Sequence, residues 1–237
     1  MSNLNRLVVV SGGSKGIGKA IIERFAAEGF DIATYSRNSD HLEKLSRDIQ
    51  SRYGVTCITK VVDASVRNEV ESFGREILAL NREISVLVNN AGSFVPGAIL
   101  EEEEGAVASM IETNLYSAYF LTRIVGPVLK SQGNGHVFNI CSIASFTAYT
   151  NGGSYAISKH ALLGFSRVLR EELKTSGVKV TAVHPGATFT SSWEGAGFPE
   201  ERFISAGDIA ETVFSAYSLS PSAVVEDIVI RPQLGDI

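Results

Sequence analysis

The chain has 237 residues and a formal net charge of −5 at pH 7. This acidic balance offers no basic surface for nucleic acid or an anionic membrane, and no apolar run approaches the roughly 20 residues of a membrane span. Its length and its hydrophobic content of 44% favour one globular domain over residues 1–237. The first residues, Met1 to Arg6, show no signal-peptide pattern. We therefore expect a cytoplasmic protein without a nucleic-acid or membrane partner.

Cysteine and histidine are too scattered to indicate a metal site. Cys57 and Cys141 both lie in strand-like apolar runs, where a small buried thiol is the usual outcome. The four histidines share no spacing of the kind that metal ligands show. We expect neither a disulfide nor a bound metal.

Short apolar runs alternate along the chain with longer segments of helical period. We expect strands near residues 6–11, 31–35, 57–62, 84–89, 135–141, 178–184 and 225–230. We expect helices near residues 16–28, 40–52, 66–80, 102–131, 153–174 and 207–219. Most of the strands are β-branched and apolar on both faces, as in a parallel sheet covered by helices. The alternation predicts an α/β fold with a Rossmann-type, doubly wound parallel sheet of seven strands in a single domain.

A glycine-rich turn follows the first predicted strand. The stretch from Ser11 to Gly18 reads SGGSKGIG, with its glycines spaced GxxxGxG. Glycine permits a tight turn and close backbone approach, and the start of the following helix points free N–H groups at a phosphate. The pattern alone is weak, since many strand-to-helix turns are rich in glycine. Its position after the first strand and before an amphipathic helix favours a dinucleotide site.

The acidic run from Glu101 to Glu104 falls at the start of the predicted helix 102–131. Carboxylates suit the positive end of a helix dipole. We therefore expect these residues to form no more than the solvated first turn of that helix.

One helical turn separates Tyr155 from Lys159. Side chains at positions i and i+4 share a helix face, with Cβ atoms roughly 5–6 Å apart. A phenol has a pKa of about 10, and an ammonium held nearby should lower it toward neutrality, giving a usable proton donor and acceptor. Ser142, at the end of the apolar run that starts at His136, can supply a hydroxyl beside the phenol. Taken alone, the pair would more often be two surface side chains of an amphipathic helix.

Together these motifs resemble the short-chain dehydrogenase/reductase family, and the resemblance runs from Arg6 to the C-terminus. The matching pieces occur in the family's order and at about its spacing: the glycine loop 12–18, Asp63, Asn89-Asn90-Ala91-Gly92, Asn114, Ser142, Tyr155 with Lys159, and His184-Pro185-Gly186. The resemblance implies a Rossmann-type fold, a nicotinamide cofactor and oxidoreductase activity. Ser117 stands where many members have Gly, a departure that leaves the chemistry intact.

The resemblance also implies a catalytic set of Asn114, Ser142, Tyr155 and Lys159. Tyr155 would be the acid when a ketone is reduced and the base when an alcohol is oxidised, while Ser142 would stabilise the developing oxyanion. Lys159 would hold the nicotinamide ribose and keep the pKa of Tyr155 low, and Asn114 would position a water in a proton relay. Cofactor contacts are implied for Gly12, Ser14, Gly16, Ile17, Gly18, Asp63, Ala64, Asn90, Ala91, Gly92, Tyr155, Lys159, Pro185, Gly186, Thr188 and Thr190. Asn90 could instead cap a strand end, and Thr190 could be plain loop.

The residues after the second predicted strand indicate which nicotinamide cofactor binds. NAD-preferring sheets place Asp or Glu there, about 20 residues beyond the glycine loop, to bind the ribose 2′-hydroxyl. The stretch from Thr34 to Asn38 contains Ser36 and Arg37 but no acid. Arg37 can bind a 2′-phosphate bidentately and Lys15 can add a second positive charge, although both could be solvated surface cations. We expect NADP(H) rather than NAD(H), and a reductive direction.

The segment 187–206 lies between the sixth strand and the next helix, where this family builds its substrate lid. Its aromatic residues are Phe189, Trp193, Phe198 and Phe203. Aromatic rings on a flexible loop favour a planar or apolar substrate that is covered on closure, although they could equally pin the loop to the core. We expect Trp193 to contact the substrate and Tyr149, with Thr147, to line the opposite wall.

Three functions stay open. The ending from Val225 to Ile237 and the segment 190–193 are similar to bacterial sepiapterin-reductase-like carbonyl reductases, which favours reduction of a small carbonyl substrate. A 3-oxoacyl-carrier-protein reductase is the alternative, but the glycine pair common near the end of those enzymes is absent, and only Arg123 and Lys130 could meet an acidic carrier. A non-catalytic dinucleotide-binding sensor or scaffold is the third, and the intact catalytic set argues against it.

The oligomeric state follows mostly from the resemblance, because members of the family usually pair through the helices that carry Asn114 and Tyr155. The small residues Ala156, Ala161 and Gly164 would allow close helix approach, or could pack on the sheet. We expect a homodimer or a homotetramer.

Overall fold

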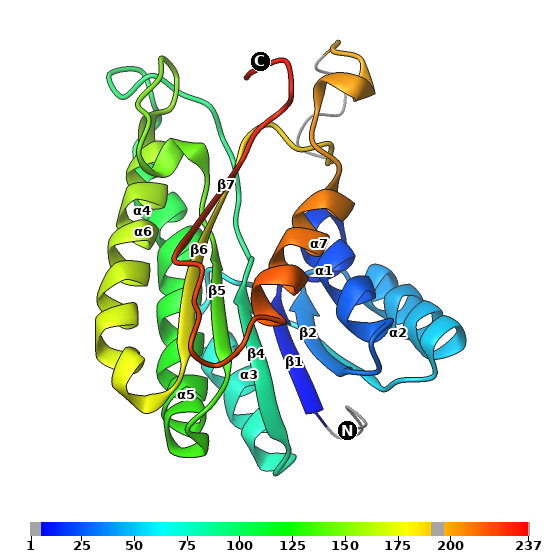
Figure 1. Ribbon diagram of the computed structural model, residues 1–237. Helices are drawn as coiled ribbons and strands as arrows, with labels where there is room; N and C mark the ends of the chain where they lie inside the picture. Colours follow the sequence, from blue (N-terminus) through cyan, green and yellow to red (C-terminus); the bar gives the residue numbers. More distant parts are fainter. Residues whose placement is uncertain (1–5, 191–196, 237) are drawn as a thin grey trace.

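Seven parallel strands form one sheet in the computed structural model, which describes residues 6–190 and 197–236 (Figure 1). The strands are β1 (Arg6–Ser11), β2 (Asp31–Ser36), β3 (Cys57–Val61), β4 (Glu83–Asn89), β5 (His136–Ile140), β6 (Lys179–Pro185) and β7 (Asp227–Ile230). Their order in the sheet is β3-β2-β1-β4-β5-β6-β7. The order reverses between β1 and β4, and such a switch point opens a crevice at the carboxyl ends of the strands.

The central strands are buried on both faces because most of their side chains are apolar. Val8, Val9 and Val10 of β1 are each 0% exposed. Successive residues of a strand point to opposite faces, so Val8 and Val10 join one core cluster with Phe25 while Val9 joins the other with Phe73. This burial on both sides confirms the prediction of a parallel sheet covered by helices.

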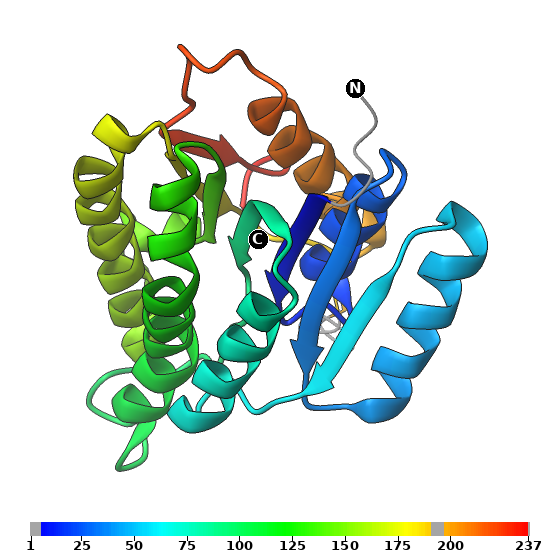
Figure 2. The ribbon, with the colours of Figure 1, turned by 90° about the horizontal axis from the view of Figure 1, so that it is seen from below.

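Helices cover both faces of the sheet, as Figure 2 shows from below. They are α1 (Gly16–Ala26), α2 (Ser39–Tyr53), α3 (Arg67–Ala79), α4 (Ala106–Ile111), the π-helical turn η1 (Glu112–Tyr116), α5 (Ser117–Gln132), α6 (Gly153–Leu173) and α7 (Ala206–Tyr217). Most buried apolar residues of α1, α2 and α7 belong to one core cluster, and those of α3 belong to the other. Those of α5 and α6 are divided between this second cluster and a smaller third one. In the part of the chain that the structure describes, no helix is long and apolar enough to cross a membrane.

The predicted fold class is confirmed, but the helix expected over 102–131 is wrong at its start. The helix begins at Ala106, and the residues before it form turns. Gly105, directly before the helix, has a left-handed φ of 89°. Glycine adopts this conformation at little cost, and it lies outside the helical region, so the helix cannot extend through Gly105 toward Glu102. The acidic run from Glu101 to Glu104 therefore lies outside the helix, and its position bears on the site below.

Candidate active site

Backbone hydrogen bonds hold the glycine turn after β1, and the turn is packed so closely that some of its positions accept only glycine. The N–H groups of Gly12 and Gly13 donate to the Tyr35 carbonyl at 3.0 and 3.3 Å. Gly12 has a left-handed φ of 68°. A Cβ on Gly18 would lie 2.4 Å from the Asn90 side-chain nitrogen and 2.6 Å from the Gly12 oxygen. Both glycines are thus required by the geometry, for conformation at one and for space at the other.

Asn90, directly after β4, fixes this turn from the neighbouring strand. Its side-chain Nδ2 donates to the carbonyls of Ser11 at 3.0 Å and Gly12 at 2.9 Å. The Ser11 hydroxyl accepts from the N–H groups of Asn90 at 2.8 Å and Ala91 at 2.9 Å. The Nδ2 group of Asn90 therefore binds the backbone at the end of β1. This structural role is similar to the alternative prediction that Asn90 caps a strand end.

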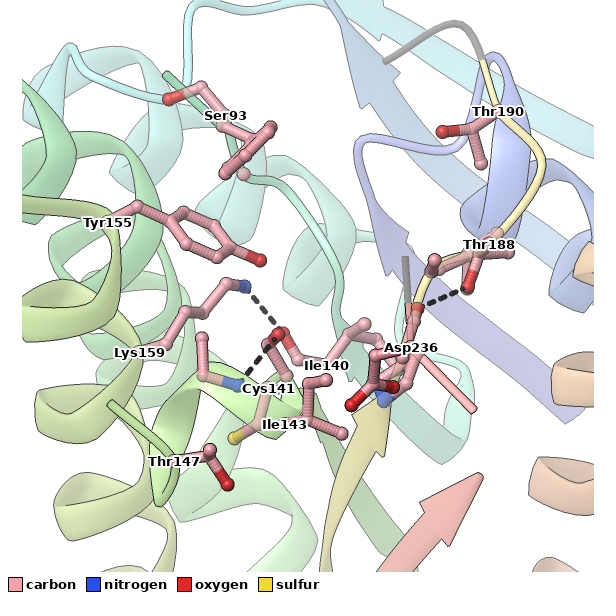
Figure 3. A pocket seen from close by; sticks show the side chains of 18 of the residues that line it. Ser93, Ile140, Cys141, Ile143, Thr147, Tyr155, Lys159, Thr188, Thr190 and Asp236 are labelled. Carbon is pink, nitrogen blue, oxygen red and sulfur yellow. Dashed lines mark hydrogen bonds between the residues drawn. The ribbon is translucent and has the colours of Figure 1, made fainter. Parts of the chain in front are cut away.

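A cavity of about 380 Å³ opens at the carboxyl ends of the strands (Figure 3). It brings together most of the predicted catalytic and substrate residues and part of the predicted cofactor residues: Ile17, Asn90, Gly92, Ser142, Thr147, Tyr149, Tyr155, Lys159, Pro185, Gly186, Thr188 and Thr190. Figure 3 shows Tyr155 and Lys159 on one side and Thr188 and Thr190 on the other. Predicted residues that do not line it are Gly12, Ser14, Lys15, Gly16, Gly18, Ser36, Arg37, Asp63, Ala64, Ala91 and Asn114. Trp193 lies outside the described residues.

Tyr155 lies in the first turn of α6 and lines the same cavity as Ser142. The ring of Phe94 packs edge-on against the Tyr155 ring, with 4.8 Å between centroids. Burial raises the pKa of Tyr155, and the interaction with the nearby Ser142 hydroxyl opposes this only in part. The expected lowering of the Tyr155 pKa is therefore wrong for this structure, because loss of solvation is the largest influence on the phenol and raises its pKa.

Lys159 is only 5% exposed, and burial lowers its pKa to about 8. Its ammonium donates to the backbone oxygen of Ile140 at 2.8 Å and lies 5.8 Å from the centroid of the Tyr155 ring. The i,i+4 spacing does place both groups in one cavity, as the sequence predicts. The ammonium stays largely charged at neutral pH, since neutral pH is below its pKa.

Asn114 is fully buried in the π-helical turn η1 and does not line the cavity. Its Oδ1 accepts from the Ser93 N–H at 2.7 Å, and its Nδ2 donates to the Ser93 oxygen at 3.0 Å and to the Ser158 hydroxyl at 2.9 Å. The side chain thus ties the segment after β4 to α6, one residue from Lys159. A π-helical turn is a frequent feature of functional sites, and no sequence pattern indicated it.

Arg37 and Asp63 follow β2 and β3, which are paired neighbours in the sheet. The Asp63 carboxylate accepts from the N–H and the hydroxyl of Ser65 at 2.9 and 2.8 Å. These bonds lower the pKa of Asp63, and the nearby Arg37 lowers it further. Lys15 is exposed and directly precedes α1. Three predicted cofactor residues therefore gather where the strands of this half of the sheet end.

The described part of the segment 187–206 does not place its aromatic rings over the cavity. Thr188 pairs with Ile204 in an isolated bridge, and the rings of Phe189 and Phe203 lie 5.7 Å apart. Neither ring lines the cavity, and nor does Phe198. Phe189 and Phe203 pack against each other. This contact supports the alternative that these two rings hold the loop in place rather than cover a substrate.

Some cavity residues were not predicted from the sequence. Ser93 and Phe94 come from the loop after β4, and Asp236 comes from the C-terminal tail, where Arg231 donates to its Oδ1 at 3.2 Å. No local pattern marks Asp236, because it reaches the site only through the path of the tail past β7. Among the described residues, no group of His, Cys, Asp and Glu could hold a metal ion.

An open parallel sheet with a glycine turn at its switch point defines a protein of the dinucleotide-binding α/β class. Residues 6–197 match the short chain dehydrogenase family, and the chain belongs to this family of oxidoreductases.

Similar proteins extend over nearly the whole chain. A sepiapterin reductase of Chlorobaculum tepidum is 31% identical, over 99% of both chains. Among solved structures, an alcohol dehydrogenase of the archaeon Thermococcus sibiricus, complexed with 5-hydroxy-NADP, is 28% identical with a TM-score of 0.90 and covers 98% of both chains. An L-sorbose reductase of Gluconobacter frateurii, complexed with NADPH and L-sorbose, is 25% identical with a TM-score of 0.87, over 95% of both chains.

Proposed function

We propose that this protein is an NADPH-dependent reductase of a small carbonyl substrate, with Tyr155 as the proton donor. The observation that carries the proposal is that Ser142, Tyr155 and Lys159 line one cavity beside the glycine turn. When bound, the reduced nicotinamide supplies a hydride to the carbonyl carbon. The protein then has to bind the carbonyl oxygen, orient it and give it a proton.

The geometry suits each of those tasks. Ser142 and Tyr155 line the same cavity, and their hydroxyls are close enough to influence one another, so a carbonyl oxygen placed at both hydroxyls would accept from each. The raised pKa of Tyr155 keeps the phenol protonated at neutral pH, which an acid requires. The ammonium of Lys159 would favour the phenolate that forms when the proton leaves. Asn114, which anchors Ser93 against α6, would position this set and the water of a proton relay.

The NADP(H) preference is proposed from the residues after β2. Ser36, Arg37 and Asn38 stand where an acid would otherwise bind the ribose 2′-hydroxyl. The guanidinium of Arg37 is suited to a 2′-phosphate, and Lys15, directly before α1, can add a second positive charge. The two similar structures above are complexes with 5-hydroxy-NADP and with NADPH, which supports the same choice.

The cofactor contacts proposed for this chain are those of the glycine turn, of Asp63 with Ala64, of the segment 90–92 and of the cavity wall. Pro185, Gly186, Thr188 and Thr190 form that wall at the end of β6. A Cβ on Gly16 would lie 3.2 Å from the Thr190 side chain, so the wall and the glycine turn are adjacent. One elongated ligand could therefore contact both.

A small carbonyl substrate is favoured over a carrier-bound acyl chain. The cavity is compact, at about 380 Å³, and the similarity to a sepiapterin reductase extends to both chain ends. Arg123 and Lys130 line a separate hollow between α5 and α6 that shares no residue with this cavity. They are thus poorly placed to dock an acidic carrier at the cavity mouth. Tyr149 and Trp193 are proposed substrate contacts.

We also propose that the chain forms a homo-oligomer through α5 and α6. Tyr119 and Val168 are 38% and 59% exposed on these helices, and both border the hollow that contains Arg123 and Lys130. Exposed apolar residues around one hollow are typical of a surface that another subunit covers.

The test of the function is NADPH oxidation, followed at 340 nm, with diketones, pterins and acetoacetyl thioesters as substrates. We expect turnover with a small carbonyl compound, and a loss of about 10²- to 10⁴-fold in the Tyr155→Phe variant with NADPH binding retained. Unchanged turnover in that variant would remove Tyr155 from the mechanism. Preference for the thioesters would favour the carrier-protein reductase instead.

A further inference from the structure

We propose that Glu102 is a positioning residue for Tyr155, acting as a carboxylate cap on the N-terminus of α6. The inference rests on the proposed function, because it concerns the placement of the proposed proton donor. It also reverses the expectation that the run from Glu101 to Glu104 is only a solvated helical turn.

The contact is made by both carboxylate oxygens. Glu102 Oε1 accepts from the backbone N–H of Ser154 at 2.8 Å, and Oε2 accepts from the Ser154 hydroxyl. Ser154 is 2% exposed and directly precedes Tyr155. The helix has no capping side chain of its own, since its N-cap residue is Gly152. A residue 52 positions away in the sequence therefore satisfies the start of this helix.

Two glycines leave the space that the carboxylate occupies. A Cβ on Gly153 would lie 2.1 Å from Glu102 Oε1 and 2.4 Å from the Gly97 oxygen. A Cβ on Gly97 would lie 2.7 Å from Glu102 Cγ. The Gly97 N–H also donates to the Asn151 carbonyl at 3.0 Å. The loop after β4 is thus fastened to the start of α6 at two points, by a backbone bond and by Glu102.

The same loop contacts the reactive side chain itself. Phe94, eight residues before Glu102, packs against the Tyr155 ring at 4.8 Å, and both line the cavity. In Figure 1 the loop after β4 and the turn before α6 lie together at one end of the sheet. Loosening the cap would free the first turn of α6 and the ring that packs on it together. A displacement of about 1 Å at a reacting group can cost about 100-fold in rate.

The charge of Glu102 also fits the helix end. Hydrogen bonds from Ser154 lower the pKa of Glu102, so the carboxylate is ionised at neutral pH. A negative charge is favourable at a helix N-terminus. Glu104, on the same loop, is exposed and makes no side-chain hydrogen bond or ion pair with α6 within the described residues, which makes it a matched control.

The experiment compares Glu102→Gln, Ser154→Ala and their double variant with Glu104→Gln. In Glu102→Gln the amide can still accept from the Ser154 N–H, but its NH2 group replaces the second acceptor. We expect kcat for carbonyl reduction to fall about 10- to 100-fold in this variant, with NADPH affinity within about twofold of wild type. Ser154→Ala should lose about three- to tenfold, because the backbone bond remains. Glu104→Gln should stay within about twofold.

A residue that acts only on stability would change the melting temperature and cofactor affinity along with kcat. Positioning through Ser154 instead predicts that the double variant loses less than the product of the two single losses. The proposal is overturned if Glu102→Gln keeps kcat within about twofold, if its loss tracks NADPH affinity, or if the two losses multiply. Should Glu102→Gln fail to fold, Ser154→Ala decides alone, and unchanged kcat there overturns it.

The failure of the proposed function looks different. If Tyr155→Phe keeps full turnover, Tyr155 is not the proton donor and the role of Glu102 falls with it. If Tyr155→Phe loses turnover and Glu102→Gln does not, only the positioning role is wrong.

Discussion

The ammonium nitrogen of Lys159 lies 5.8 Å from the centre of the Tyr155 ring, and burial shifts the pKa values of the two groups in opposite directions, so that the ammonium becomes the more acidic group. The phenol is raised from its ordinary value of 10.0, and the ammonium is lowered from 10.5 to about 8. Of the two, Lys159 therefore loses its proton first as the pH rises. The pH dependence of the reaction should report Lys159 rather than Tyr155.

Carbonyl reduction should be steady near neutral pH and decline above about pH 8, because Lys159 then loses the charge that favours the phenolate. The measurement is kcat against pH at saturating NADPH. In Lys159→Arg the decline should move to higher pH, since a guanidinium keeps its charge. A wild-type profile that stays level to pH 10 would contradict this reading.

The buried ammonium should also reduce the stability of the fold at neutral pH. Its pKa is lower in the folded chain than the ordinary 10.5, so between about pH 8 and 10.5 the unfolded chain binds more protons. Stability relative to Lys159→Met should then be lowest below pH 8 and should rise through that window, by up to about 3 kcal/mol. Urea unfolding of both proteins at several pH values measures the difference between their free energies of unfolding. A difference that does not change with pH would show that the buried ammonium does not destabilise the fold.

Arg37→Ala should reduce kcat/KM for NADPH by about 10- to 100-fold while changing that for NADH less than about threefold. The reason is that only NADPH carries the 2′-phosphate that the guanidinium would bind. Arg47→Ala, which removes an exposed cation from α2, serves as the control for overall charge. Equal losses with both cofactors would remove Arg37 from 2′-phosphate recognition.

Gly18→Ala should destabilise the chain by about 1–3 kcal/mol and weaken NADPH binding. The added methyl would meet Asn90 Nδ2 at 2.4 Å and the Gly12 oxygen at 2.6 Å, so the glycine turn has to move. The control is Gly207→Ala in α7, where the nearest atom would be Ser205 Oγ at 3.5 Å. There alanine should add about 0.5–1 kcal/mol through helix propensity. Thermal unfolding of both variants distinguishes crowding from a general effect of alanine.

Val168→Glu should weaken self-association, because it places a charge on the exposed apolar surface of α5 and α6. Light scattering would give the mass of wild type and variant. A wild-type mass of one chain at micromolar concentration would refute the proposed oligomer.

The sheet could be predicted because its signals are local. Each strand is an apolar run such as the one from Arg6 to Ser11, and each adjoining helix shows the expected period. The residues that end these strands, such as Ser142 and Asn90, could be assigned to one edge because parallel strands share it. The spacing of Tyr155 and Lys159 fixes their common helix face in the same local way.

What could not be predicted depends on contacts between distant segments. Nothing in the run from Glu101 to Glu104 tells which carboxylate reaches Ser154, since that is decided by the path of the loop and by the absence of a side chain on Gly153. The direction in which the Tyr155 pKa shifts likewise depends on how deeply the phenol is buried, and the spacing of Tyr155 and Lys159 in the sequence carries no information about burial.

Two turns from different strands behave here as one piece. Ser11 and Gly12 at the end of β1 share hydrogen bonds with Asn90 and Ala91 at the end of β4. Asn90 also lies so close to Gly18 that only glycine fits at that position. A designer who transplants the glycine-rich turn into another scaffold must therefore carry the asparagine segment with it. Recombination that separates the two stretches would leave each without the partner that gives it shape.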